Sequence, residues 1–326
     1  MNVSIIGMAR SGSAAARLAQ RLGYRVRISD ACAGAHQSAA TRRELEQRAD
    51  ELRALGIWVE LGEHTPACLD AAQLVVTSPG VPDDAPPLRW ARQRTLPVIS
   101  EIEFAVRHTT ARIVAITGTN GKTTTTALLG HILNSAGMPV VVAGNIGQAL
   151  SNVVEQAGAQ HTLVLEISSF QLETVETFKP HVAVWLNLTP DHLDRYKTME
   201  AYGQAKGRIF RTLTLDDWAV IWRHDRALVQ PHLDGISARC VWLDERGEWK
   251  PSPREPFGAT LDNGEFSTHL HGVRHTHGRF ADLRITGMHN AVNILASCAA
   301  ARILHVPAHA LSEALHTFPG LPHRLE

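Results

Sequence analysis

The chain has few cysteines, no excess of either charge and no long apolar run. Its four cysteines are scattered among 326 residues without a CxxC pair. This spacing disfavours a zinc site and a disulfide scaffold, and it is typical of a reducing compartment. The cysteines are Cys32, Cys68, Cys240 and Cys298.

The balance of charge excludes some partners. Thirty-two basic residues face thirty-two acidic ones, so the chain has no overall field to hold nucleic acid or an anionic membrane. The sequence has neither an apolar stretch of 18 residues nor a signal pattern at its start. These absences predict a cytoplasmic protein with no membrane segment and no nucleic-acid partner.

The order of the predicted elements indicates an α/β protein with two main domains. The length and the 44% hydrophobic content exceed what one ordinary core requires. Within residues 1–100, apolar runs alternate with helical patterns, which predicts a Rossmann-like, doubly wound sheet. Residues 101–320 predict a larger central α/β domain, with a helix over about 288–304.

A glycine-rich turn lies near the start of the chain. Gly7-Met-Ala9-Arg-Ser-Gly12 resembles the dinucleotide fingerprint, and Asp30 ends the second predicted strand. The middle glycine is replaced by Ala9, whose methyl group would crowd a pyrophosphate. Ala9 therefore argues against a nicotinamide site. The alternative to a ligand-binding turn is a turn that serves only the geometry of the fold.

Residues 113–126 carry the most specific chemical signal. The apolar run Ile113–Ile116 predicts a buried strand, followed by a glycine loop and a helix that begins at Lys122. Such a loop offers phosphates backbone amides, a helix dipole, an ammonium and a hydroxyl for Mg²⁺. Ile116 stands where the full P-loop pattern has its first glycine, and a chance Gly-Lys-Thr is the alternative. The pattern predicts a nucleoside-triphosphate site in a P-loop-type domain.

Polar residues follow two further predicted strands. Glu166 ends the apolar run over 162–167, where a carboxylate requires a cation or hydrogen bonds, so Mg²⁺ or a structural salt bridge is expected. His192 follows the run over 182–186 and is a candidate metal ligand or substrate contact. Lys206, one of only five lysines, lies on the predicted helix 199–210. The alternative interpretation is that Lys206 lies on a solvated helix face and has no role in the site.

The region 218–280 predicts short strands joined by tight turns. Leu261-Asp-Asn-Gly264 predicts a hairpin turn. We expect the histidines of this region, including His271, His275 and His277, on a solvated surface.

Six ordered segments together resemble the Mur ligases of peptidoglycan synthesis. The similarity spans the whole chain, and six motifs in order are more specific than any one alone. The segments are Gly-Thr-Asn-Gly-Lys-Thr (118–123), Gly-Asn-Ile-Gly (144–147), Leu-Glu-Ile-Ser-Ser-Phe-Gln-Leu-Glu (165–173), Asp-His-Leu-Asp-Arg-Tyr (191–196), His-Asn-Ala-Val-Asn (289–293) and Gly-Leu-Pro-His-Arg (320–324).

The resemblance implies a monomeric, ATP-dependent amide ligase that joins D-glutamate to UDP-N-acetylmuramoyl-L-alanine through an acyl phosphate. It implies two Mg²⁺ ions held by Thr123, Glu166, His192 and a carbamylated Lys206. The implied catalytic residues are Lys122, Glu166, His192 and Lys206. The implied ATP contacts are Gly118, Thr119, Asn120, Gly121, Lys122, Thr123, Thr124, Thr125, Asn290, Asn293 and Arg324. The implied contacts to the UDP-linked substrate are Arg10, Ser11, Asp30, Ser78, Gly80, Asn145, Ser168 and His192.

The family also has a third domain, which the resemblance places from about the segment 320–324 onward. Residues 321–326 are therefore expected to be the stub of that domain, and the sequence to be a fragment that binds the UDP-linked substrate without full turnover. Two alternatives remain open. One is a related ligase that extends folate with glutamate, and the other is a non-catalytic nucleotide-binding module.

Overall fold

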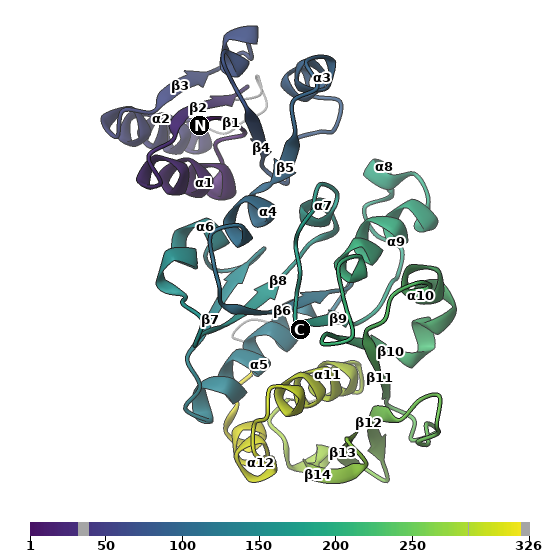
Figure 1. The fold of residues 1–326 in the computed structure, drawn as a ribbon. Coiled ribbons are helices and arrows are strands. Elements are labelled where there is room, and N and C mark those ends of the chain that lie inside the picture. Colours follow the sequence, from purple (N-terminus) through teal and green to yellow (C-terminus); the bar gives the residue numbers. More distant parts are fainter. Residues whose placement is uncertain (32–38, 286, 321–326) are drawn as a thin grey trace. The chain divides into compact units, whose positions relative to one another are not determined.

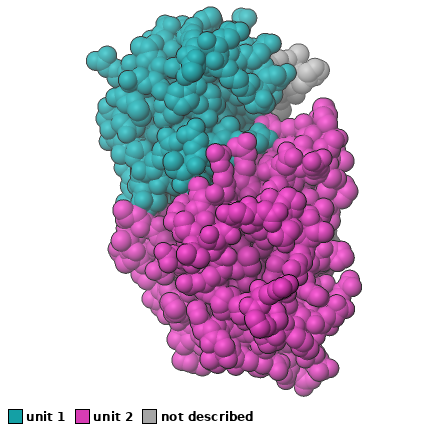
Figure 2. Space-filling model, turned by 45° about the vertical axis from the view of Figure 1, so that its right-hand side comes forward, with its two compact units in different colours: residues 1–109, 148–156, 170–178 teal, residues 110–147, 157–169, 179–326 magenta. Residues whose placement is uncertain are grey.

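The computed structural model describes residues 1–31, 39–285 and 287–320 (Figure 1). The chain forms two compact units (Figure 2). The first unit comprises residues 1–109, 148–156 and 170–178, and the second comprises 110–147, 157–169 and 179–326. The first compact unit thus extends to residue 109 and takes in two later segments, while the expected domain boundary at residue 100 stays a prediction. No helix among the described residues is long and apolar enough to cross a bilayer.

The first unit contains a five-stranded parallel sheet in the order β3-β2-β1-β4-β5. This is the order of a Rossmann-like sheet, so the predicted fold class of this region is confirmed. The strands are β1 (Asn2–Ile6), β2 (Arg25–Asp30), β3 (Trp58–Leu61), β4 (Leu74–Thr77) and β5 (Val98–Ser100).

Short helices cover this sheet. α1 packs on β1 and β2 through small buried residues, including Ala14, Ala15 and Ala19, which allow a close approach of helix and sheet. The two inserted segments contribute α6 and most of α7. The helices are α1 (Arg10–Arg21), α2 (Ala39–Ala54), the 3₁₀ turn η1 (Pro66–Leu69), α3 (Pro86–Gln93), α4 (Glu101–Val106), α6 (Leu150–Val153) and α7 (Ser169–Leu172).

The second unit is built on a nine-stranded sheet in the order β14-β13-β12-β11-β10-β9-β6-β8-β7. The seven strands β12-β11-β10-β9-β6-β8-β7 pair in parallel. The pairings of β12 with β13 and of β13 with β14 are antiparallel. The strands are β6 (Arg112–Thr117), β7 (Val140–Gly144), β8 (Thr162–Glu166), β9 (Val182–Trp185), β10 (Trp218–Trp222), β11 (Arg239–Asp244), β12 (Phe257–Asp262), β13 (Glu265–Leu270) and β14 (Val273–Arg279).

Three helices of the second unit pack together with this sheet (Figure 1): α5, which follows the glycine loop, contacts both α11 and α12. They enclose the main apolar core with the inner residues of β6, β8, β9 and β10, such as Val114, Val164, Val184 and Val220. The helices of this unit are α5 (Lys122–Ser135), α8 (Leu193–Tyr196), α9 (Met199–Gly207), α10 (Arg226–Leu233), α11 (His289–Ile303) and α12 (Ala308–Thr317).

The hairpin between β12 and β13 confirms one local prediction and overturns another. Asn263 and Gly264 have φ angles of 49° and 79°, as a tight two-residue hairpin turn requires. His271 is exposed, as expected, but His277 is buried, so the prediction of a solvated His277 was wrong. The physical reason is a partner: the Nε2 atom of His277 lies 2.8 Å from the hydroxyl oxygen of Thr268 on β13.

Candidate functional site

The glycine loop of the second unit connects the end of β6 to the start of α5. Gly118 and Gly121 have φ angles of 151° and 84°, which side-chain-bearing residues rarely adopt. A Cβ atom on Gly121 would lie 2.1 Å from the Asn293 side-chain oxygen, and one on Gly118 would lie 2.9 Å from the Leu186 Cβ atom. Both glycines are therefore required by backbone conformation and by space.

Asn187, which follows β9, fixes the shape of the loop. Its side-chain oxygen accepts a hydrogen bond from the backbone N–H of Asn120 at 2.8 Å, and its amide nitrogen donates to the Asn120 carbonyl at 3.1 Å. The Thr119 N–H donates to the backbone carbonyl of Asn187 at 2.9 Å. Asn187 was not among the predicted site residues, although its position directly after a buried strand was a usable signal.

Lys122 begins α5, and its ammonium folds back over the loop. The Nζ atom donates to the carbonyl oxygens of Gly118 at 3.0 Å and Thr119 at 2.7 Å. An ammonium held there lies among the amides of a loop at a helix N-terminus. This is the arrangement that binds anionic phosphate.

The predicted pair Thr123 and Glu166 is brought together. The Thr123 hydroxyl donates to Oε2 of Glu166 at 2.9 Å, and the side-chain amide of Asn145 donates to Oε1 at 2.9 Å. Glu166 is only 2% exposed, so these donors offset the loss of hydration of its carboxylate. Asn145, which is expected to contact the muramoyl substrate, thus also contacts the Glu166 carboxylate next to the glycine loop.

Lys206 is buried on α9 and reaches the same loop, which rules out the alternative of a solvated helix face. Its Nζ atom donates to the Gly118 carbonyl at 2.8 Å and lies 4.6 Å from the ring centre of Tyr202. Burial and the nearby ammonium of Lys122 lower the pKa of Lys206 to about 7. A considerable fraction of the side chain is therefore a neutral, nucleophilic amine near neutral pH.

His192 lies on the same side of the second unit as Lys206. Its ring packs edge-on against that of Tyr202 with centroids 6.0 Å apart, and its Nε2 atom is 3.6 Å from a carboxylate oxygen of Asp191. The Tyr202 hydroxyl accepts a hydrogen bond from Thr119 at 3.4 Å. Tyr202, which the sequence analysis missed, therefore contacts the glycine loop, Lys206 and His192.

The two predicted asparagines of α11 lie in one hydrogen-bonded row. Asn293 donates to Asn290 at 2.9 Å and accepts from the Thr125 hydroxyl at 3.3 Å. This row places Asn293, which is 3% exposed, against the phosphate loop, and its contact with adenine stays a prediction. Thr124 and Ser168 are half-buried near the loop and after β8, respectively. Arg324 lies outside the described residues.

In the first unit, the predicted substrate residues gather at the carboxyl ends of the strands. The Met8 N–H donates to the Asp30 carboxylate at 2.6 Å, and the Ser78 hydroxyl donates to the Gly7 carbonyl at 3.0 Å. Arg10 and Ser11 form the first turn of α1. Gly80 is exposed in the turn after β4. These residues surround the glycine turn, where parallel sheets bind ligands.

The first unit matches the family model "Mur ligase MurD-like, N-terminal domain" over residues 1–100, and the second matches "Mur ligase middle domain" over residues 116–301. The chain is 40% identical to the UDP-N-acetylmuramoylalanine–D-glutamate ligase of Pelotomaculum thermopropionicum and 42% identical to that of Geotalea uraniireducens. Each alignment covers 99% of this chain and 68% of the relative.

Two solved structures share the fold. The murein peptide ligase mpl of Psychrobacter arcticus matches with a TM-score of 0.62 at 20% identity, covering all of this chain and 70% of that one. UDP-N-acetylmuramate-alanine ligase MurC of Thermotoga maritima matches with a TM-score of 0.52 at 22% identity, covering 98% and 69%.

A phosphate loop at the end of a buried parallel strand, with a lysine, a hydroxyl and a carboxylate around it, defines a nucleoside-triphosphate-binding enzyme of the α/β class. The comparisons identify which one. The chain belongs to the Mur ligase family, the ATP-dependent, ADP-forming amide ligases of peptidoglycan precursor synthesis.

Proposed function

We propose that this chain carries the ATP site and the UDP-substrate site of a ligase that joins D-glutamate to UDP-N-acetylmuramoyl-L-alanine. The observation that carries the proposal is the convergence of Lys122, Thr123, Glu166 and Lys206 on one glycine loop. The names of relatives about 40% identical support this choice of substrates.

The chemistry has two steps. The γ-phosphoryl group of ATP moves to the alanyl carboxylate and gives an acyl phosphate and ADP. The amine of D-glutamate then attacks the acyl carbon, the amide forms, and phosphate leaves. Lys122 and the loop amides offset the charge of the transferring phosphoryl group in the first step.

Thr123 and Glu166 would hold one Mg²⁺. Their oxygen atoms are 2.9 Å apart and are hard ligands of the kind that Mg²⁺ prefers. Among the described residues, no three His, Cys, Asp or Glu side chains form a metal-binding group, so phosphate oxygens and water would complete the shell. The ion, when bound, supplies positive charge beside the phosphates.

A second Mg²⁺ would be held by His192 and by Lys206 as a carbamate. An ammonium has no lone pair for a cation, so Lys206 must first react as a neutral amine with CO₂, which forms the N–C bond and releases one proton. The low pKa of Lys206, about 7, supports this reaction because the neutral amine is populated near neutral pH.

In the first unit we assign Arg10, Ser11, Asp30, Ser78 and Gly80 to the UDP moiety. Asn145, Ser168 and His192 of the second unit are assigned to the muramoyl part. Asn290, Asn293 and Arg324 remain the proposed adenine contacts. We further propose that the protein is a cytoplasmic monomer that has no nucleic-acid or membrane partner. Light scattering of the purified chain tests the monomeric state.

The test is calorimetry of the purified chain with UDP-N-acetylmuramoyl-L-alanine and, separately, with ATP and Mg²⁺. We expect saturable heat in both titrations. Lys122→Met should abolish the ATP signal and leave the UDP-substrate signal unchanged. The absence of heat with the UDP-linked substrate at roughly millimolar concentration, where even weak specific binding is measurable, would refute the assignment. Binding of a folate instead would favour the folate-extending alternative.

A further inference from the structure

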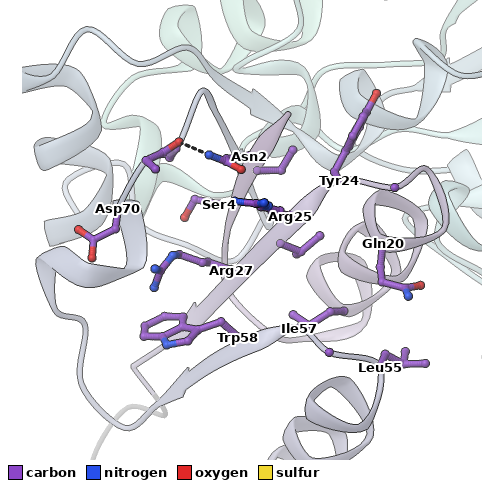
Figure 3. Close-up of a pocket in the computed structure, with 16 residues that line it drawn as sticks. Asn2, Ser4, Gln20, Tyr24, Arg25, Arg27, Leu55, Ile57, Trp58 and Asp70 are labelled. Carbon is purple, nitrogen blue, oxygen red and sulfur yellow. Dashed lines mark hydrogen bonds between the residues drawn. The ribbon is translucent and has the colours of Figure 1, made fainter.

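A cavity lies at the amino ends of the strands of the first unit's sheet, opposite the glycine turn at their carboxyl ends. It has a volume of about 480 Å³ and is lined by residues at the amino ends of β1, β2 and β3 and in the loops that lead into them (Figure 3). This volume is within the range of small-molecule sites.

The register of the strands places two arginines in this cavity. On β2, Val26 and Ile28 are buried, while Arg25 is exposed and Arg27 is half-buried. Because side chains alternate along a strand, Arg25 and Arg27 project from the same face of the sheet, about 7 Å apart at their Cβ atoms. Arg27 is paired in register with Trp58 of β3.

Within the described part of the chain, neither Arg25 nor Arg27 forms an ion pair with a carboxylate. Asp70 is the one acidic residue among those lining the cavity, so two positive charges face one negative charge. Two neighbouring cations repel each other, and an anion between them relieves this repulsion.

Aromatic side chains form part of the wall. The Arg27 guanidinium lies 4.7 Å from the ring centre of Trp58, and Figure 3 shows these two side chains next to each other. Trp58 is 38% exposed, so part of its ring is available to a ligand. Tyr24 also lines the cavity, but its ring packs against Phe104 and His108. The cavity thus combines cations with aromatic surface.

We propose that this cavity binds a small organic phosphate, with its phosphate between Arg25 and Arg27 and its apolar part against Trp58. Guanidinium groups are well suited to phosphate because their planar donors match its oxygens. The proposal goes beyond the ligase activity and does not rest on it. Every residue involved lies at the amino ends of the strands, whereas the proposed UDP site lies at their carboxyl ends.

The test is an NMR titration of the ¹⁵N-labelled chain with phenyl phosphate, followed at the indole N–H of Trp58, which Trp58→Phe assigns. We expect a saturable shift at roughly millimolar ligand. Arg25→Gln/Arg27→Gln should weaken binding about tenfold or more, because it removes both charged donors. The matched control Arg42→Gln/Arg43→Gln removes two exposed charges from α2 and should leave binding unchanged.

Three results would overturn the proposal: no saturable shift in the wild type, an unchanged shift in the Arg25/Arg27 variant, or equal affinity for inorganic phosphate, which would remove the role of the aromatic wall. If the double variant fails to fold, Arg25→Gln alone serves, because its side chain is exposed. Saturating UDP should not change the Trp58 shift, which separates this cavity from the proposed substrate site.

Discussion

Lys122 and Lys206 donate hydrogen bonds to the same oxygen atom, the carbonyl of Gly118, at 3.0 and 2.8 Å. Two ammonium groups on one acceptor repel each other, and this repulsion adds to burial in lowering the pKa of Lys206. Conversion of Lys206 to a carbamate would replace a positive charge with a negative one. The same neighbour, Lys122, would then stabilise the modified side chain.

We therefore expect Lys206 to be carbamylated in solution. Because only the neutral amine reacts, the modified fraction should increase as the pH rises through about 7. ¹³C NMR of the chain in ¹³C-bicarbonate should show a carbamate signal that Lys206→Arg abolishes. Lys250→Arg, which changes an exposed lysine, is the control and should retain the signal. A signal that survives in Lys206→Arg, or none in the wild type, contradicts the prediction.

Gly121→Ala should abolish ATP binding. The added Cβ atom would lie 2.1 Å from the Asn293 oxygen, and the φ angle of 84° disfavours alanine on its own. Gly137→Ala is a matched control, because Gly137 also has a positive φ, 72°, but its Cβ atom would meet nothing within 4 Å. We expect the control to bind ATP normally in calorimetry and to lose only about 1 kcal/mol of stability. Equal loss of ATP binding in both variants would contradict the prediction, because it would mean that Gly121→Ala acts through a general loss of structure and not through the contact with Asn293.

The sequence was sufficient to predict the elements that carry strong periodicity or motifs. The strand before the glycine loop, the helix from Lys122 and the position of β8 follow from apolar runs and glycines in order. The contacts of Tyr202 were not predictable, because an aromatic residue on a helix gives the same pattern in a core as beside a loop. The inserted segment 170–178 was also missed. Its attachment depends on Glu103, whose buried carboxylate accepts from the backbone N–H groups of residues 176–178, a tertiary contact without a sequence signature.

Asp225 lies beside the strand end that carries Asn187, and no pattern in the sequence singles it out. Its carboxylate, 3% exposed, accepts from the Trp185 indole at 2.9 Å and from the backbone N–H of Leu188. Trp185 and Leu188 flank Asn187, which holds the glycine loop. Asp225 therefore supports the loop through its neighbours.

Asp225→Asn should lower ATP affinity about tenfold, since an amide offers one acceptor oxygen where the carboxylate offers two. Calorimetry should show unchanged affinity for the UDP-linked substrate. This affinity is a control, because a general loss of structure would weaken the binding of both ligands. Asp234→Asn, at an exposed site that accepts from Gln230, is the control. Parallel losses for both ligands would mean that Asp225 supports the fold as a whole.

His277 should make the second unit less stable in acid. Burial, with smaller contributions from Arg302 and His275, lowers the pKa of His277 from 6.5 to about 4. Between these two values the unfolded chain binds a proton that the folded chain does not, so stability is full above pH 6.5 and decreases as the pH falls towards 4. From pH 7 to pH 5 this histidine should remove about 2 kcal/mol from the free energy of unfolding.

Urea unfolding of the wild type and of His277→Gln at both pH values measures this difference. Glutamine can keep a hydrogen bond to Thr268 but does not titrate, so the variant should lose less stability than the wild type on acidification. His271→Gln changes an exposed histidine and should follow the wild type. Identical pH dependence of the wild type and His277→Gln would contradict the prediction, because it would mean that folding does not lower the pKa of His277.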